Sequence, residues 1–244
     1  MNRYHAFGRH LLVSAAVGAA LLALCWFVWY PSPMLMAIGG HEIFLLIVGI
    51  DVIVGPLLTL IVFKSGKRSL KFDLAVIATI QIYAMVYGMS SLLEARPAYV
   101  ASLGDAFHVV QASEVTDENL RKANATLPWW GPKWVGTKYE IDSDLKDVVR
   151  DVGSVGGGKG HFPQLHVAYE SVQKRVAEDA MPISDMKKYV SEKSTEVDEW
   201  LKARGYDETS AKYQAIKVGA AYFAIILDGK TGSIVGISPF KLKM

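Results

Sequence analysis

Long apolar runs dominate the first 92 residues, and mixed polar and apolar patterns follow them. The runs lie near residues 11–30, 38–63 and 72–92. Each is at or above the ~20 residues that a helix needs to cross a hydrocarbon core of ~30 Å. Beyond Glu94 charged residues recur every few positions, as in a soluble domain. The pattern predicts a three-helix transmembrane region over residues 1–93 and a second domain over residues 94–244.

Helical patterns in the second domain are short. Thr116 is a suitable N-cap for a helix that runs to Asn124, and Ser143 opens a brief helix over Asp144–Val152. The longest helical pattern spans Ser184–Arg204 and stops at Gly205.

Strand patterns complete the second domain. Phe107–Ala112 is predicted to be a strand, and Lys133–Ile141 is predicted to be extended. The clearest hairpin joins Ile216–Leu227 to Ser233–Ile237 through a turn at Asp228–Gly232. The apolar end of its first arm is too short for a fourth membrane span. We therefore expect an α+β domain with an antiparallel sheet.

Lysine and arginine residues in the short loops predict the orientation in the membrane. Arg3 and Arg9 precede the first span, and four basic residues lie between Lys64 and Lys71, whereas the link at residues 31–40 has none. We expect a cytoplasmic N-terminus and an exported C-terminal domain. A cleaved signal peptide ending near Cys25 is the alternative, but more apolar sequence follows it.

The charge of the exported domain limits which partners it can bind, and its cysteine content excludes internal disulfides. Six of the 26 basic residues and three of the 24 acidic residues precede Glu94, so this domain is close to neutral. That balance argues against nucleic acid as a partner. Cys25 is the only cysteine, so the domain has no disulfide framework.

The second span carries an acid at its midpoint, Asp51. Gly55 and Thr59 follow at four-residue intervals, so the three residues form one stripe on a helix. Small and hydroxyl residues allow another helix to approach closely and to hydrogen-bond. Pro56 removes one main-chain hydrogen bond and should bend this helix.

Two readings of this stripe stay open. In the first, Asp51 bonds to Gln81 or Tyr83 of the third span and holds the helices together. In the second, it faces a site for a transmembrane helix of another protein, with Gly55, Pro56, Thr59 and Gln81 around it. A proton relay is less favoured, because the spans offer only this one mid-membrane acid.

The exported domain shows no clear catalytic or cofactor motif. Gly153–Gly160 fits the spacing of a phosphate-binding loop, except that Gly160 replaces the final Ser or Thr, so a flexible loop is favoured. His161 and His166 are five residues apart, which is not a helical ligand spacing, and no metal site is predicted. We expect a protein that is not an enzyme and needs no cofactor.

Three tryptophans lie in the segment Pro128-Trp129-Trp130-Gly131-Pro132-Lys133-Trp134, whose prolines and glycine predict a turn. Tryptophan is usually buried, but aromatic residues are also enriched at interaction hot spots. We expect at least one of the three in the core, and we take Trp129 and Trp130 as candidates for a contact with a partner or with lipid.

Several blocks together resemble a known family. They are Ala6-Phe7-Gly8-Arg9-His10-Leu11-Leu12, Trp29-Tyr30-Pro31, Gly39-Gly40, Asp51 with Gly55-Pro56-Leu57-Leu58-Thr59, Asp73-Leu74, Gln81, Tyr87-Gly88 and Ala95-Arg96-Pro97. The chain up to about Val110 resembles the TfpX/TfpZ type IV pilin accessory proteins, and Arg96 of the last block is a further candidate contact. Beyond Val110 only the size and general character are similar.

The resemblance implies a multi-pass protein of the bacterial inner membrane with a periplasmic C-terminal domain. Its implied role is that of an accessory protein or chaperone that binds its cognate major type IV pilin and assists pilin stability or pilus assembly. The lipid bilayer is its second partner, and a homo-oligomer is possible. The alternative is a membrane-anchored periplasmic sensor that binds a ligand without catalysis.

Overall fold

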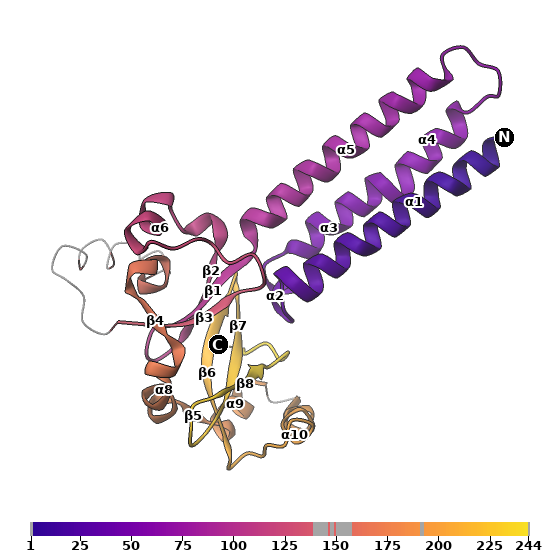
Figure 1. Ribbon diagram of the computed structural model, residues 1–244. Helices are drawn as coiled ribbons and strands as arrows, with labels where there is room; N and C mark the ends of the chain where they lie inside the picture. Colours follow the sequence, from indigo (N-terminus) through magenta and orange to yellow (C-terminus); the bar gives the residue numbers. More distant parts are fainter. Residues whose placement is uncertain (1, 139–145, 147–148, 150–157, 191–192, 244) are drawn as a thin grey trace. The chain divides into compact units, whose positions relative to one another are not determined.

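The computed structural model describes residues 2–138, 146, 149, 158–190 and 193–243. The chain packs as two compact units. The first joins Met1–Trp29 to Gly39–Ala95, and the second joins Tyr30–Ile38 to Arg96–Met244. Figure 1 shows the elements of each unit in sequence colours.

The first unit consists of three long helical segments. They are α1 (Arg3–Ala23) with the π-helical turn η1 (Leu24–Trp29), then α3 (Gly40–Val48), the π-helical turn η2 (Gly49–Val54) and α4 (Gly55–Val62), and finally α5 (Leu70–Ala95). All three are long and apolar enough to cross a membrane, so three apolar helices are confirmed near the predicted positions. The second segment packs against both α1 and α5 (Figure 1).

The second segment loses its regular hydrogen bonding near Pro56. The N–H of Gly55 donates to the carbonyl of Ile50, five residues back. Pro56 has no N–H with which to continue the α-helical ladder to Val52. The π-helical turn η2 therefore precedes the proline, and Asp51 lies within it. Such turns are frequent at functional sites.

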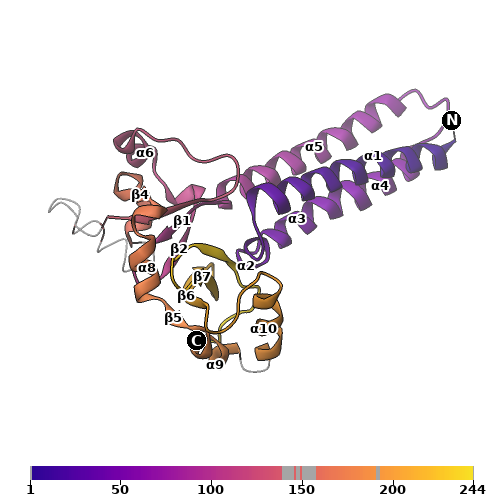
Figure 2. The same ribbon diagram turned by 60° about the horizontal axis from the view of Figure 1, so that its bottom comes forward.

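The second unit is built on one curled sheet. Its strands are β1 (Pro97–Ser102), β2 (Phe107–Gln111), β3 (Lys133–Thr137), β4 (His166–Ala168), β5 (Met181–Pro182), β6 (Ala211–Val218), β7 (Ala221–Asp228) and β8 (Ile234–Ile237). Their order is β4-β3-β1-β2-β6-β7-β8, with β5 paired to β6. Figure 2 shows the sheet from a second direction.

The sheet is mixed, so the prediction of an antiparallel sheet was wrong. β1 pairs with β3 in parallel, and β2 pairs with β6 in parallel, whereas the other pairs are antiparallel. Helices lie in the chain between the parallel partners, which lets the chain return in the same direction. Local sequence patterns carry no signal for this order.

Five α-helices belong to the second unit as the structure describes it. They are α2 (Met34–Ala37), α6 (Asp117–Ala123), α8 (Gln173–Asp179), α9 (Ile183–Val190) and α10 (Ser194–Lys202). The helix expected after Thr116 is confirmed as α6. The Thr116 hydroxyl accepts from Asn119 N at 3.2 Å, and Asn124 ends the helix with φ of 48°. The predicted helix over Asp144–Val152 falls mostly outside the described residues.

The long helix predicted over Ser184–Arg204 is two helices, α9 and α10. Lys193 has φ of −118° and ψ of 18°, which breaks the helical geometry between them. Both helices bury their apolar sides in one cluster with the sheet, through Met186 of α9 and Leu201 of α10 among others. Two short helices can both follow a curled sheet, which one straight helix of this length cannot.

The predicted first arm of the hairpin, Ile216–Leu227, is also interrupted. β6 ends at Val218, and the chain reverses through Gly219, whose φ of 58° favours glycine. The hairpin between β7 and β8 is confirmed. Its turn is held by Asp228, whose carboxylate accepts from Thr231 N at 2.7 Å.

Strand β7 is buried on both of its faces. Phe223, Ile225 and Leu227 belong to a cluster that includes α8, whereas Ala224 and Ile226 belong to the cluster with α9 and α10. Side chains alternate between the faces of a strand, so each face of β7 has its own core.

The link between the first two helical segments is part of the second unit. Met34 is fully buried in the same cluster as Phe107 and Val218. A Cβ on Gly219 would lie 2.7 Å from the carbonyl oxygen of Ala37, so the turn after β6 closely approaches α2. The link between the first two helical segments therefore packs into the core of the second unit.

Candidate functional site

A cavity of about 180 Å³ lies in the first unit between α1 and α5. Its lining residues are His10, Val13, Ser14 and Val17 of α1, Asp51 of η2, and Ala78, Gln81, Ile82 and Met85 of α5. Most of these side chains are apolar, and Asp51 is the one acid among them. We call this cavity the Asp51 groove. The cavity therefore presents apolar walls and a single acidic residue.

Gln81 holds the main chain of the π-helical turn. Its side chain is largely buried, and its Nε2 donates to the carbonyl oxygen of Asp51 at 3.0 Å. The structure thus brings together Asp51 and Gln81, as we expected if Asp51 holds the helices together, but the bond is made to the main chain of Asp51. Tyr83, the other expected partner, is 73% exposed and does not line the groove.

The Asp51 carboxyl group is only partly used. Its Oδ1 is buried and has no hydrogen-bond partner within the described part of the chain. A buried polar atom without a partner has a free-energy cost of about 1–3 kcal/mol. A donor group that enters the groove would recover this cost by bonding to the carboxyl oxygen.

Gly55, Pro56 and Thr59 are all buried inside the three-helix unit. A Cβ on Gly55 would overlap the side-chain amide of Gln81, so glycine lets α4 and α5 approach. Thr59 Oγ1 lies 2.7 Å from His10 Nδ1, which ties α4 to α1. Gly55, Pro56 and Thr59 therefore make contacts between the helices of the first unit. Asp51 is the residue of the stripe that lines the groove.

His10 and Ser14 were not among the site residues that the sequence suggested. They lie one turn apart on α1 and line the groove opposite α5. Ser14 is 8% exposed. Two polar residues in an apolar run could have marked them as candidate site residues from the sequence. Only the fold shows that they line the same groove as Asp51.

The second unit exposes two tryptophans on one loop, residues 128–131, which we call the tryptophan loop. Trp129 is 51% exposed and Trp130 is 78% exposed. Arg96 is buried beneath them, where its Nη2 donates to the Pro128 carbonyl at 3.1 Å and its guanidinium lies 5.9 Å from the centre of the Trp129 ring. Trp134, by contrast, packs against the core and meets Phe107 edge-on.

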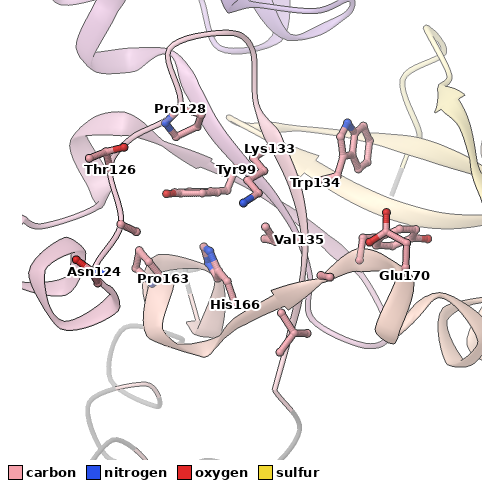
Figure 3. Close-up of a pocket in the computed structure, with 14 residues that line it drawn as sticks. Tyr99, Asn124, Thr126, Pro128, Lys133, Trp134, Val135, Pro163, His166 and Glu170 are labelled. Carbon is pink, nitrogen blue, oxygen red and sulfur yellow. The ribbon is translucent and has the colours of Figure 1, made fainter.

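A pocket of about 670 Å³ lies beside the tryptophan loop, and Figure 3 shows its lining side chains. Tyr99 and His166 meet edge to face, with ring centres 4.6 Å apart, and Lys133 lies close to both (Figure 3). Glu170 lies at the other end, beside Trp134. The pocket therefore offers one cation, one anion and several hydrogen-bonding groups.

Burial shifts the pKa values of two of these side chains. It lowers the pKa of His166 and raises the pKa of Tyr99. His166 donates from Nε2 to the Gly160 carbonyl at 2.8 Å, which leaves Nδ1 as an acceptor in the neutral ring. This chemistry suits the binding of a polar group.

Comparison with known proteins identifies relatives by sequence. The chain is 31% identical over 182 residues to the fimbrial assembly protein of serogroup I from Dichelobacter nodosus. The matched region covers 72% of this chain and 71% of the relative. The serogroup E1 protein gives the same values. The protein of serogroups C1 and C2 is 38% identical over 118 residues, or 48% of this chain and 90% of the relative. No family model and no solved structure matches the chain.

Proposed function

This chain belongs to the family of fimbrial assembly proteins, and on that premise we propose that it binds a type IV pilin in the inner membrane and assists its assembly into a pilus. In this proposal the protein is an accessory protein or chaperone and not an enzyme. The three helices contact the transmembrane helix of the pilin, and the second unit, on the periplasmic side, contacts its head.

The Asp51 groove is the observation that carries this proposal. Association of helices in lipid depends on close packing and on hydrogen bonds, because apolar side chains gain little by leaving a hydrocarbon solvent. The groove offers both, since apolar side chains of α1 and α5 line it and the Asp51 carboxyl borders it. A pilin helix that carries an amine or another donor at matching depth would satisfy the free carboxyl oxygen.

Site-specific photocrosslinking tests the groove. A photoreactive residue in place of Val13 or Ile82, which line it, should crosslink to the pilin on illumination of living cells. The matched control is Ile61 of α4, which is 78% exposed and lies outside the groove lining. Pilin adducts as abundant at Ile61 as at Val13 and Ile82, or absent from all three, would contradict the proposal.

The proposed orientation has the N-terminus in the cytoplasm. It rests on the basic residues before the first span and between the second and third spans. Met34 of the first link is buried in the core of the second unit. This burial supports a topology in which the first link and the C-terminal domain lie on the same side of the membrane.

Reporter fusions should therefore give a defined pattern. A cytoplasmic reporter should be active when it is fused after residue 66, and a periplasmic reporter should be active after residues 35 and 160. Opposite activity at residue 66 would reverse the orientation, and opposite sides for residues 35 and 160 would contradict the packing of the link.

The tryptophan loop is the proposed contact on the second unit. Two exposed tryptophans offer large rigid surfaces of the kind that is enriched at interaction hot spots. Arg96 is too deeply buried to contact a partner itself. We assign it the role of holding the loop through its hydrogen bond to the Pro128 carbonyl.

Alanine substitutions should separate contact from stability. Trp130→Ala should reduce capture of the pilin head but change the free energy of unfolding by less than about 0.5 kcal/mol, because its side chain is exposed. Trp134→Ala is the matched control, and it should cost about 1–3 kcal/mol because that ring packs against the core. Capture is measured by co-purification, and unfolding by thermal melting in detergent. Normal capture by a Trp129→Ala, Trp130→Ala double variant would remove the loop from the proposal.

The pocket of Figure 3 favours a second candidate function, that of a membrane-anchored sensor without catalysis. Its volume is in the range of small-molecule sites, and its polar groups converge from several elements. Deletion of the gene distinguishes the two candidates. Loss of surface pili supports the assembly role, whereas normal piliation supports the sensor.

A further inference from the structure

Three potential metal ligands meet on the second unit, and none of them belongs to the tryptophan loop or to the lining of the Asp51 groove. His108 lies on β2, Glu114 ends the 3₁₀ turn η3 (Ala112–Glu114), and His161 ends the 3₁₀ turn η4 (Gly158–His161). One ligand atom from each lies within 4.8 Å of the other two. His161 Nε2 and Glu114 Oε2 are 3.6 Å apart, and the two imidazole rings have centres 5.4 Å apart.

Glu114 is held in place by the main chain. Its Oε2 accepts from the N–H of Gln111 at 2.7 Å, as one half of a reciprocal capping arrangement with the Gln111 side chain. Because η3 follows β2 directly, this bond fixes the carboxylate close to His108.

The turn that carries His161 is fitted closely to the sheet. A Cβ on Gly160 would lie 3.0 Å from Val110 Cγ2 and 3.1 Å from the Cβ of Ala101, so only glycine lets η4 lie this near β1 and β2. The Gly160 carbonyl accepts from His166. His161 is consequently buried, with its side chain 11% exposed, and it faces His108.

We propose that His108, Glu114 and His161 form a binding site for a divalent transition metal, with Zn²⁺ as the best fit. Two imidazoles and one carboxylate are a known zinc donor set, and imidazole nitrogen also suits Cu²⁺ and Ni²⁺. Zinc–ligand bonds of about 2.0–2.2 Å place ligand atoms about 3.3–3.6 Å apart in a tetrahedron. Modest side-chain rotations bring the three atoms from their present separations to that range.

The carboxylate is essential to the charge balance of this site. Lys217 of β6 lies in register with His108, and its positive charge opposes the binding of a cation. Glu114 offsets that charge and completes the donor set. Three protein ligands leave a fourth position for water or for a group from a partner.

The sequence alone predicted no metal site, because His161 and His166 do not have a helical ligand spacing and no nearby cysteine or acid completes a site with them. His108 and Glu114 are close in the chain, but His161 comes from a distant segment, and β2 is brought beside η4 only by the fold. A bound metal would join β2 to η4 and so stabilise that face of the sheet. The proposed metal site does not depend on the proposed role in pilus assembly.

Metal binding is measured on the full-length protein in detergent, purified without a histidine tag and stripped of metal with a chelator. Equilibrium dialysis against Zn²⁺ should give one bound ion per chain. Co²⁺ in its place should give the visible absorption of a tetrahedral site. Zn²⁺ should also raise the melting temperature, because it binds the folded state preferentially.

Substitutions assign the ion to the cluster. His161→Ala and Glu114→Gln should each weaken Zn²⁺ binding by more than about tenfold, since even residues outside the ligand set cost about 10–100-fold. His5→Ala is the matched control, because His5 is an exposed histidine on α1 and should leave binding unchanged. Melting without metal checks that each variant folds.

Two results would overturn the proposal. One is wild-type protein that binds no Zn²⁺ in stoichiometric amount, a measurement that needs no variant. The other is unchanged binding when His108, Glu114 and His161 are all replaced in a chain that still melts cooperatively.

Discussion

Asp51→Leu is expected to abolish surface pili although the protein still accumulates in the membrane. Leucine removes the polar group, whose insertion into the middle of the bilayer costs about 2.5–3.5 kcal/mol, so the variant should insert at least as well as wild type. The loss should reach the level of a strain without the gene, because the groove would retain its apolar walls but no carboxyl group. Pili are counted by electron microscopy, and protein is quantified by immunoblot.

Asp51→Asn distinguishes the two roles of this residue. An amide can still hydrogen-bond, so normal piliation with Asn would indicate that hydrogen bonding is sufficient. Failure with Asn as well would indicate that the charge is required, as in a pair with an amine of the pilin, although desolvation offsets much of such a pair's gain. Asp73→Asn is the matched control, since Asp73 pairs with Lys67 outside the groove. Normal pili from Asp51→Leu would remove the groove from the proposal.

Met34→Ala, in the link between the first two helices, should strongly destabilise the second unit. Met34 is fully buried in the core of the second unit, and truncation of a buried methionine costs about 2–5 kcal/mol through lost burial and the cavity that remains. The measurement is denaturant unfolding of the full-length protein in detergent, followed by tryptophan fluorescence.

Met36→Ala is the internal control for that experiment. Met36 lies on the same short helix, α2, but is 56% exposed, so its truncation should change the free energy of unfolding by less than about 0.5 kcal/mol. An effect of Met34→Ala as small as that of Met36→Ala would show that Met34 does not contribute to the core of the second unit.

Features that depend on neighbouring residues could be predicted from the sequence. The three spans follow from unbroken apolar length, since a helix satisfies all its main-chain groups within one segment. The same holds for α6, which begins where the Thr116 hydroxyl caps it, and for the turn before β8, which Asp228 organises. Asp51 was recognisable as a candidate because an acid is rare in such a run.

Features that depend on distant partners could not be predicted. Ile216–Leu227 is apolar except for Lys217, and only pairing within the sheet shows where it reverses at Gly219. Parallel pairing of β1 with β3 depends on where the intervening segments pack, which no local pattern records. The break at Lys193 likewise reflects two helices that share one core with the sheet.

By itself, the sequence determined that this protein has three apolar helices, a second part of mixed polar and apolar composition, and an acid near the middle of the second helix, because each of these depends on composition within one segment. The tertiary structure decided which way the polar residues of the spans face. It turned Gly55 towards Gln81 and Thr59 towards His10, and left the Asp51 carboxyl at the groove. It also placed Met34 in the core of the second unit and His108 beside His161, because contacts between residues far apart in the chain form only when the whole sheet is assembled.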